Sequence, residues 1–162
     1  MRIMPFVLLA FAACGPSNTE LRTAKTAVYA DASQVFAIAE QAAGEENYKL
    51  VADEGHLMFE TVPKWYSAEG DLRSAGADDY TLINGHSVKV SFIVAVTSTG
   101  PSQYAVTVTP HTYQYVAGSP QLRPLEPNDP YLPTWVTGRA DALSMSIYDR
   151  AKGLALKPVG ST

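Results

Sequence analysis

Residues 88–96 read VKVSFIVAV, and this stretch decides the fold. Successive side chains of an extended strand point to opposite faces, so alternate residues share a face. One face of this stretch would carry Val88, Val90, Phe92, Val94 and Val96. The other face holds Ile93 and Ala95 and is therefore partly apolar as well. Apolar residues on both faces favour a buried strand, so residues 88–96 are predicted to form the central strand of a sheet.

Shorter alternating stretches precede the central strand. Residues 48–52 and 57–62 both have the pattern of strands, and the polar stretch 53–56 between them is typical of a turn. Pro63 weakens further pairing, because proline lacks the backbone N–H that a sheet ladder uses. Residues 64–79 show no regular period and contain two glycines, so they are expected to form an exposed excursion.

Turn signals flank the central strand on both sides. Asn84-Gly85 predicts a tight hairpin turn between strands at 80–83 and 86–89, with positive φ at both turn residues. On the other side, residues 103–109 alternate between apolar and polar. Residues 111–116 are predicted to be either a last strand or a bent continuation of residues 103–109.

Helical spacing appears near both ends of the chain. Asp31 is predicted to cap a helix over residues 31–44, with Gln34 completing a capping box. Thr134 is predicted to cap a second helix that Gly153 ends. The expected buried stripes are Val35, Phe36, Ala39, Ala42 and Ala43 in the first helix, and Val136, Ala140, Leu143, Ile147 and Ala151 in the second.

This order of elements predicts an α+β fold. Two amphipathic helices bury their apolar stripes most simply on one sheet face, giving a two-layer sandwich with a four- to five-stranded antiparallel sheet. Residues 117–133 hold five prolines, so they are expected to lack regular structure. The sequence thus predicts one domain over residues 29–153, preceded by a tether at 14–28 and followed by a loose tail at 154–162.

The N-terminus has the pattern of a secretory leader. Residues 1–13 read MRIMPFVLLAFAA, a basic start followed by an apolar stretch of eleven residues, which is too short to span a bilayer. Phe11-Ala12-Ala13-Cys14 resembles the lipobox of bacterial lipoproteins, although Phe11 stands where that family usually has Leu. The resemblance implies removal of residues 1–13 and attachment of a diacylglyceryl group to the sulfur of Cys14.

The same resemblance implies a location. In Gram-negative envelopes, Gly15 rather than Asp after the lipidated cysteine suggests the outer membrane, with the domain in the periplasm. Ala10-Phe11-Ala12 offers the ordinary signal peptidase an alternative site, with cleavage before Ala13. That alternative would leave the thiol of Cys14 unpaired in an oxidising compartment, because this is the only cysteine of the chain.

Charge narrows the classes of partner. After removal of residues 1–13, which include Arg2, the remaining 149 of the 162 residues carry 11 Lys and Arg against 16 Asp and Glu, a net charge of −5. A negative balance argues against nucleic-acid binding and against electrostatic attachment to anionic lipid head groups. Membrane association is therefore expected through the lipid on Cys14 alone.

No catalytic or cofactor motif stands out. His56, His86 and His111 are 30 and 25 residues apart, which does not match the close ligand spacing of a zinc site. The chain has no G-x-S-x-G or S-x-x-K motif. The sequence therefore predicts neither an enzyme nor a bound metal or cofactor.

Aromatic residues supply the remaining candidates for contact. Trp65 and Tyr66 lie in the expected excursion, and such amphipathic side chains are common at interfaces. They are the predicted contact residues of a non-enzymatic accessory domain that meets another envelope protein. The alternative is a domain that binds a lipid, a glycan or a peptidoglycan fragment between the sheet and its helices.

Overall fold

The computed structural model describes residues 27–46, 48, 50–74 and 83–156. Cys14, the tether up to residue 26 and most of the expected strand at 80–83 lie outside these residues. The regular elements are α1 (Ala32–Glu45), β1 (Leu50–Asp53), η1 (Glu54–His56), β2 (Met58–Thr61), β3 (Lys64–Tyr66), β4 (Leu72–Ser74), β5 (Val88–Gly100), β6 (Gln103–Gln114), β7 (Arg123–Leu125), α2 (Thr134–Ala151) and η3 (Lys152–Leu154).

The long strand β5 organises the sheet, as expected of residues 88–96. It pairs with β6 over its whole length on one edge. On its other edge it pairs with β2 at one end and with β3 at the other. β1, β4 and β7 lie outside β2, β3 and β6 respectively, and all six pairings are antiparallel. The result is a seven-stranded sheet, larger than the expected four to five strands.

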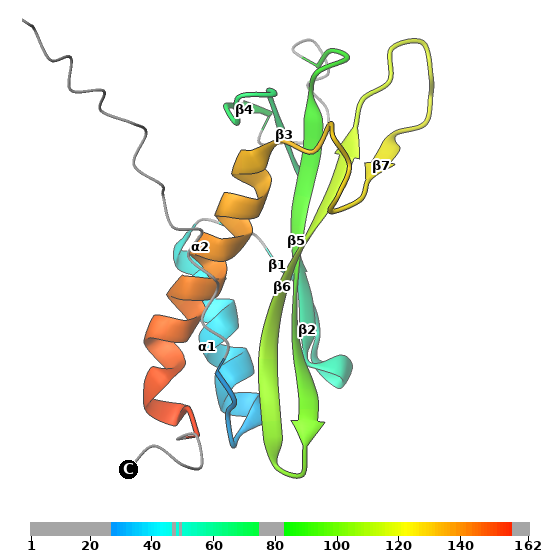
Figure 1. The fold of residues 1–162 in the computed structure, drawn as a ribbon. Coiled ribbons are helices and arrows are strands. Elements are labelled where there is room, and N and C mark those ends of the chain that lie inside the picture. Colours follow the sequence, from blue (N-terminus) through cyan, green and yellow to red (C-terminus); the bar gives the residue numbers. More distant parts are fainter. Residues whose placement is uncertain (1–26, 47, 49, 75–82, 157–162) are drawn as a thin grey trace, which may run out of the picture.

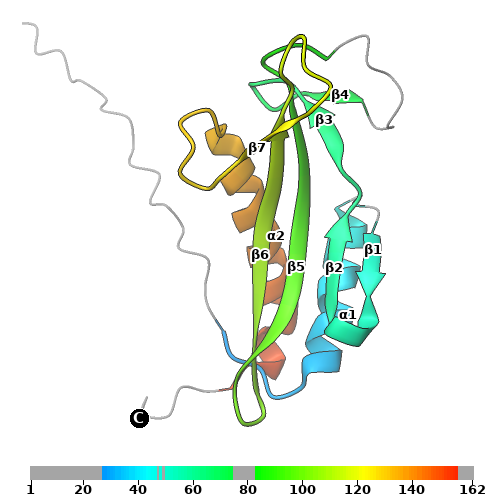
Figure 2. The ribbon, with the colours of Figure 1, turned by 90° about the vertical axis from the view of Figure 1, so that its right-hand side faces the viewer.

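Both helices cover the same face of the sheet, which confirms the predicted two-layer α+β sandwich (Figure 1). We call the opposite face, turned toward the viewer in Figure 2, the open face. All ten residues of the predicted helical stripes are buried. They pack against the inward side chains of β2 and β5, Phe59, Val88, Val90, Phe92, Val94 and Val96. This layer is the core of the domain.

The helix ends follow the predictions in part. The backbone N–H of Gln34 donates to Oδ1 of Asp31 at 2.9 Å, so Asp31 caps α1. At α2 the cap position belongs to Pro133, and Thr134 is the first helical residue. Proline is well suited to a helix start, where no backbone N–H donor is needed. Neither helix of the described part is both long and apolar enough to cross a membrane.

Residues 64–79 were expected to form an exposed excursion, and this was wrong for the described part. The segment forms β3 and β4, which extend the sheet beyond Pro63. Each strand has three residues, which is too short for a period of two to be recognised. Residues 117–133 were expected to lack regular structure, and this was wrong for β7, which has three residues and contains Pro124. It is also too short for a period of two to be recognised.

The turn before β5 also differs from the prediction. The N–H of Ser87 donates to the carbonyl of Asn84 at 2.8 Å, so Gly85 and His86 are the central residues. Oδ1 of Asn84 accepts from the N–H of His86 at 3.0 Å. Asn84 and Gly85 have no positive φ, so the predicted hairpin turn does not form there. The side chain of Asn84 stabilises a different turn one residue further along.

Residues 154–156, which follow the second helix, are more ordered than expected. Ala155 bridges to Tyr29, which in turn bridges to Tyr104 on β6. The N–H of Leu156 donates to the carbonyl of Val28 at 2.7 Å. The expected loose tail at 154–162 is therefore wrong for residues 154–156, because the incoming and outgoing segments of the domain hold each other.

Candidate functional site

The open face carries a hollow of about 560 Å³. It is lined by Glu60, Pro63, Lys89, Ser91, His111, Tyr113, Gln121 and Leu122. We call this the open-face hollow. Its position follows from the alternation along β5: Val90 and Phe92 point into the core, so Lys89 and Ser91 point to the other face.

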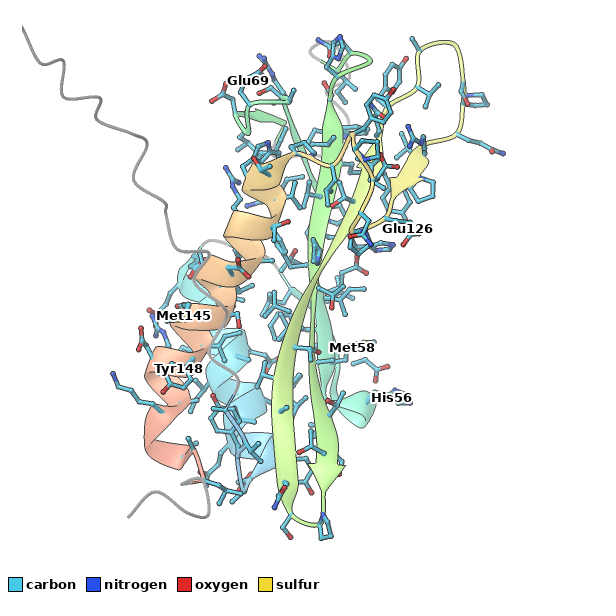
Figure 3. All side chains as sticks on the ribbon, viewed as in Figure 1. His56, Met58, Glu69, Glu126, Met145 and Tyr148 are labelled. Atoms are coloured by element: carbon cyan, nitrogen blue, oxygen red, sulfur yellow. The ribbon has the colours of Figure 1, made fainter. Side chains whose placement is uncertain are left out.

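Strand pairing brings the polar side chains of the hollow together. Ser91 lies opposite His111, and Lys89 lies opposite Tyr113. Glu60 comes from β2 on the other edge of β5, and Met58 on the same strand also points away from the helices (Figure 3). Three strands thus contribute to the hollow, and Gln121 and Leu122 reach it from the segment before β7.

A hydrogen-bonded chain runs across the floor of the hollow. Oγ of Ser91 donates to Oε1 of Glu60 at 2.6 Å. Nδ1 of His111 lies 3.1 Å from the same oxygen. The hydroxyl of Tyr113 lies 2.7 Å from Nε2 of His111, and the two ring centroids are 4.8 Å apart. A carboxylate only accepts, so this geometry places a proton on Nδ1, and the hydroxyl of Tyr113 shares a hydrogen bond with Nε2.

The carboxyl group of Glu60 is held in its charged form. Burial raises its pKa, but the hydrogen bonds from Ser91 and His111, with the charge that His111 carries when protonated, together outweigh this and lower the pKa below 4.5. Ser91 is only 2% exposed, whereas the side chains of Glu60 and His111 are about two-fifths exposed. The chain therefore presents a fixed negative charge to solvent above a buried hydroxyl.

The direction of these hydrogen bonds decides what the site can do. Ser91 donates its hydrogen bond to Glu60 and not to a ring nitrogen of His111, so the serine–histidine contact typical of an activated nucleophile is not formed here. Both ring nitrogens of His111 are engaged within the chain. The arrangement can hold a ligand through a positioned carboxylate.

Trp65 and Tyr66 do not form the exposed pair that the sequence predicted. Each is 4% exposed, so the structure contradicts that expectation. Tyr66 points toward the helices and contacts Trp135, with ring centroids 5.1 Å apart. Trp65 pairs with Lys89 and so belongs to the open face, outside the main core cluster. Pairing with β5 converts a segment that looked irregular into a buried one.

The remaining histidines do not join the site. His56 contacts Asp53 at 2.7 Å in the turn between β1 and β2. His86 lines a second hollow of about 430 Å³ with Glu69 and Arg73. Across the part of the chain that the structure describes, no group of three or more His, Cys, Asp or Glu residues is arranged to hold a metal ion.

Sequence reasoning missed the open-face hollow because it tested the histidines only for metal-ligand spacing. The available signal was positional. Glu60, Ser91 and His111 occupy outward positions of three predicted strands, and polar residues at such positions are common, so only the strand order shows that these three meet. Comparison of the chain with protein-family models and with curated proteins finds no match in either.

Proposed function

We propose that this chain is a lipid-anchored envelope protein whose domain binds a small polar ligand in the open-face hollow. The anchor rests on the resemblance of Phe11-Ala12-Ala13-Cys14 to a lipobox. The binding role rests on one structural observation, the hydrogen-bonded chain through Glu60 and His111 at the floor of the open-face hollow.

A ligand-binding domain replaces the protein-contact domain that was the first expectation from the sequence. Contact with another envelope protein was expected through Trp65 and Tyr66, and the burial of both removes the surface on which that expectation stood. The ligand site also changes place. The described side chains between the sheet and the helices form one buried cluster, whereas the hollow lies on the other face.

The tether between Cys14 and the domain would allow the hollow to lie away from the membrane. A diacylglyceryl group supplies two acyl chains, which is enough for stable anchoring. Residues 14–26 would reach at most about 45 Å when extended. The chain enters the domain at Tyr29, beside Tyr104, and His111 lies seven residues further along β6, or about 23 Å. The hollow would therefore remain accessible from the compartment.

The anchor is tested by the variant Cys14→Ser. The wild-type chain should incorporate a radiolabelled fatty acid and sediment with membranes, and the variant should do neither. Mass spectrometry of the wild-type N-terminus separates the alternatives, because lipoprotein processing begins the chain at Cys14 and ordinary signal peptidase begins it at Ala13. Membrane sedimentation of the Cys14→Ser variant would contradict the proposed anchor.

Ligand binding is tested by nuclear magnetic resonance on the full mature chain in detergent micelles. Glucose, N-acetylglucosamine, triglycine and octanoate serve as probes of four chemical classes. Binding of a polar probe should shift the signals of His111, Tyr113 and Gln121, whereas the signals of the distant helix residue Asp149 should not move. Shifts with octanoate alone, or with none of the four probes, would contradict a polar ligand site.

A further inference from the structure

We infer that the open-face hollow takes a small dipolar ligand, with an amine at Glu60 and a carboxylate at Lys89, as in a peptide of two or three residues with free ends. This inference rests on the proposed function, because it names the ligand of the same hollow. It is carried by two groups of opposite charge that line the hollow, Glu60 and Lys89, each of which has atoms without a hydrogen-bond or ion-pair partner among the described residues.

The negative end of the hollow has one free oxygen. Both hydrogen bonds to Glu60, from Ser91 and from His111, fall on Oε1. Among the described residues, Oε2 takes part in no hydrogen bond or ion pair. An ammonium group can donate to Oε2 without displacing either existing bond. The two internal donors also fix the orientation of the carboxylate, which lowers the entropy lost when a ligand binds.

The positive end is Lys89. Within the part of the chain that the structure describes, its ammonium group has no hydrogen bond and no ion pair. Its strand neighbours on the open face are Trp65 on one side and Tyr113 on the other. A lysine that is half-buried between two aromatic residues and lacks an acidic partner is a natural contact for a ligand carboxylate.

The spacing of the two ends sets the size of the ligand. Glu60 lies opposite Ile93, which is four residues from Lys89, so the two backbones are about 13 Å apart along the strand. The long side chains of both residues can shorten this span to that of two or three extended peptide units, about 7–10 Å. Ser91 and the ring of His111 lie between the ends, where peptide groups of the ligand would pass.

The test compares four forms of one probe. Triglycine is titrated with both ends free, with the amine acetylated, with the carboxylate amidated, and with both ends blocked, into the full mature chain in detergent micelles. Free triglycine should bind most tightly, and each blocked end should weaken binding about two- to fivefold, the range of partly exposed ion pairs. Isothermal titration calorimetry gives the four dissociation constants.

Two variants assign each end to its residue. In Lys89→Met, triglycine with a free carboxylate and triglycine with an amidated carboxylate should have the same dissociation constant, while a free amine should still improve binding. In Glu60→Gln, acetylation of the amine should no longer change the dissociation constant, while a free carboxylate should still improve binding. The glutamine keeps an oxygen that accepts from Ser91. Lys152→Met is the matched control, because Lys152 is exposed, contacts Asp149 at 3.6 Å and should leave all four constants unchanged. Circular dichroism of each variant confirms folding.

The outcomes separate this inference from the proposed function. Equal binding of all four forms would overturn the dipolar ligand and leave a small-ligand site in place. If a saccharide probe binds and no form of triglycine does, the dipolar ligand is likewise overturned and the small-ligand site remains. Failure of the four triglycine forms and of both saccharides would overturn the inference and the proposed ligand-binding function together.

Discussion

The guanidinium group of Arg139 lies 4.6 Å from the centre of the Tyr66 ring, and this contact joins α2 to the end of β3. The same group lies 4.9 Å from the Trp135 ring and donates to the carbonyl of Gly70 at 2.9 Å. Nε1 of Trp135 donates to the carbonyl of Ala68 at 2.8 Å. Tyr66 is therefore part of a clamp that holds the turn after β3 against the helix.

Arg139→Met should destabilise the domain by about 1–2 kcal/mol, because it removes two cation–π contacts and the hydrogen bond to Gly70 while keeping an apolar stem. Urea denaturation followed by circular dichroism measures the change. Arg150→Met is the control: Arg150 pairs with Glu45 on the surface, and its loss should cost less. Equal effects of the two variants would contradict the clamp.

Gly70→Ala should destabilise the domain by more than about 1 kcal/mol. Gly70 has a φ of 97°, and a Cβ atom there would lie 3.1 Å from the Trp135 ring. Gly138→Ala provides the opposite case within α2, because a Cβ atom there meets nothing within 4 Å. That change should stabilise by about 0.5–1 kcal/mol through helix propensity. Thermal unfolding should therefore shift in opposite directions for the two variants.

Thr112→Val should stabilise the domain by about 1 kcal/mol. Thr112 is 2% exposed, and its Oγ1 has no hydrogen-bond partner in the part of the chain that the structure describes. Valine has nearly the same shape and removes the cost of burying an unpaired hydroxyl. A lower urea midpoint for this variant would show that the hydroxyl is satisfied in solution.

Glu60→Gln should make the domain less sensitive to acid. The hydrogen bonds from Ser91 and His111 hold the pKa of Glu60 below 4.5 in spite of its burial, and unfolding removes them. The folded carboxylate therefore contributes stability above about pH 4.5, and this contribution disappears as the pH falls through the lowered pKa. The stability difference between wild type and variant should shrink between pH 5.5 and pH 3.

Chemical denaturation at each pH measures that difference. Glu126→Gln is the control, since Glu126 is exposed and its side chain has no hydrogen bond or ion pair among the described residues. Its difference from wild type should stay nearly constant over the same range. A constant difference for Glu60→Gln would mean that Ser91 and His111 do not hold the carboxylate in solution.

Pro110 shows why the length of β6 stayed open in the sequence. A proline between two alternating stretches suggests a break, yet β6 runs through it and Pro110 pairs with Phe92. Tyr104 exchanges hydrogen bonds with Tyr29, away from β5, and Pro110 lies six residues further along with the same orientation. Its missing N–H therefore faces the outer edge, where no ladder bond to β5 is lost.

The sequence by itself determined the parts of this protein that depend on local periodicity. It predicted both helices, their ten buried residues, the central strand and the two-layer arrangement, because a period of 3.6 or 2 records which face is buried. The lipobox-like motif is equally local, and its lipid anchor remains a prediction.

Only the tertiary structure decided which distant strands meet. The pairing of β3 with β5 buries Trp65 and Tyr66, although three residues are too few to show a period. The meeting of Glu60 with Ser91 and His111 depends on strand order and register, which bring residues 31 and 51 positions apart into hydrogen-bond contact. No local pattern encodes such contacts, because they follow from pairing between strands and not from the period within each strand.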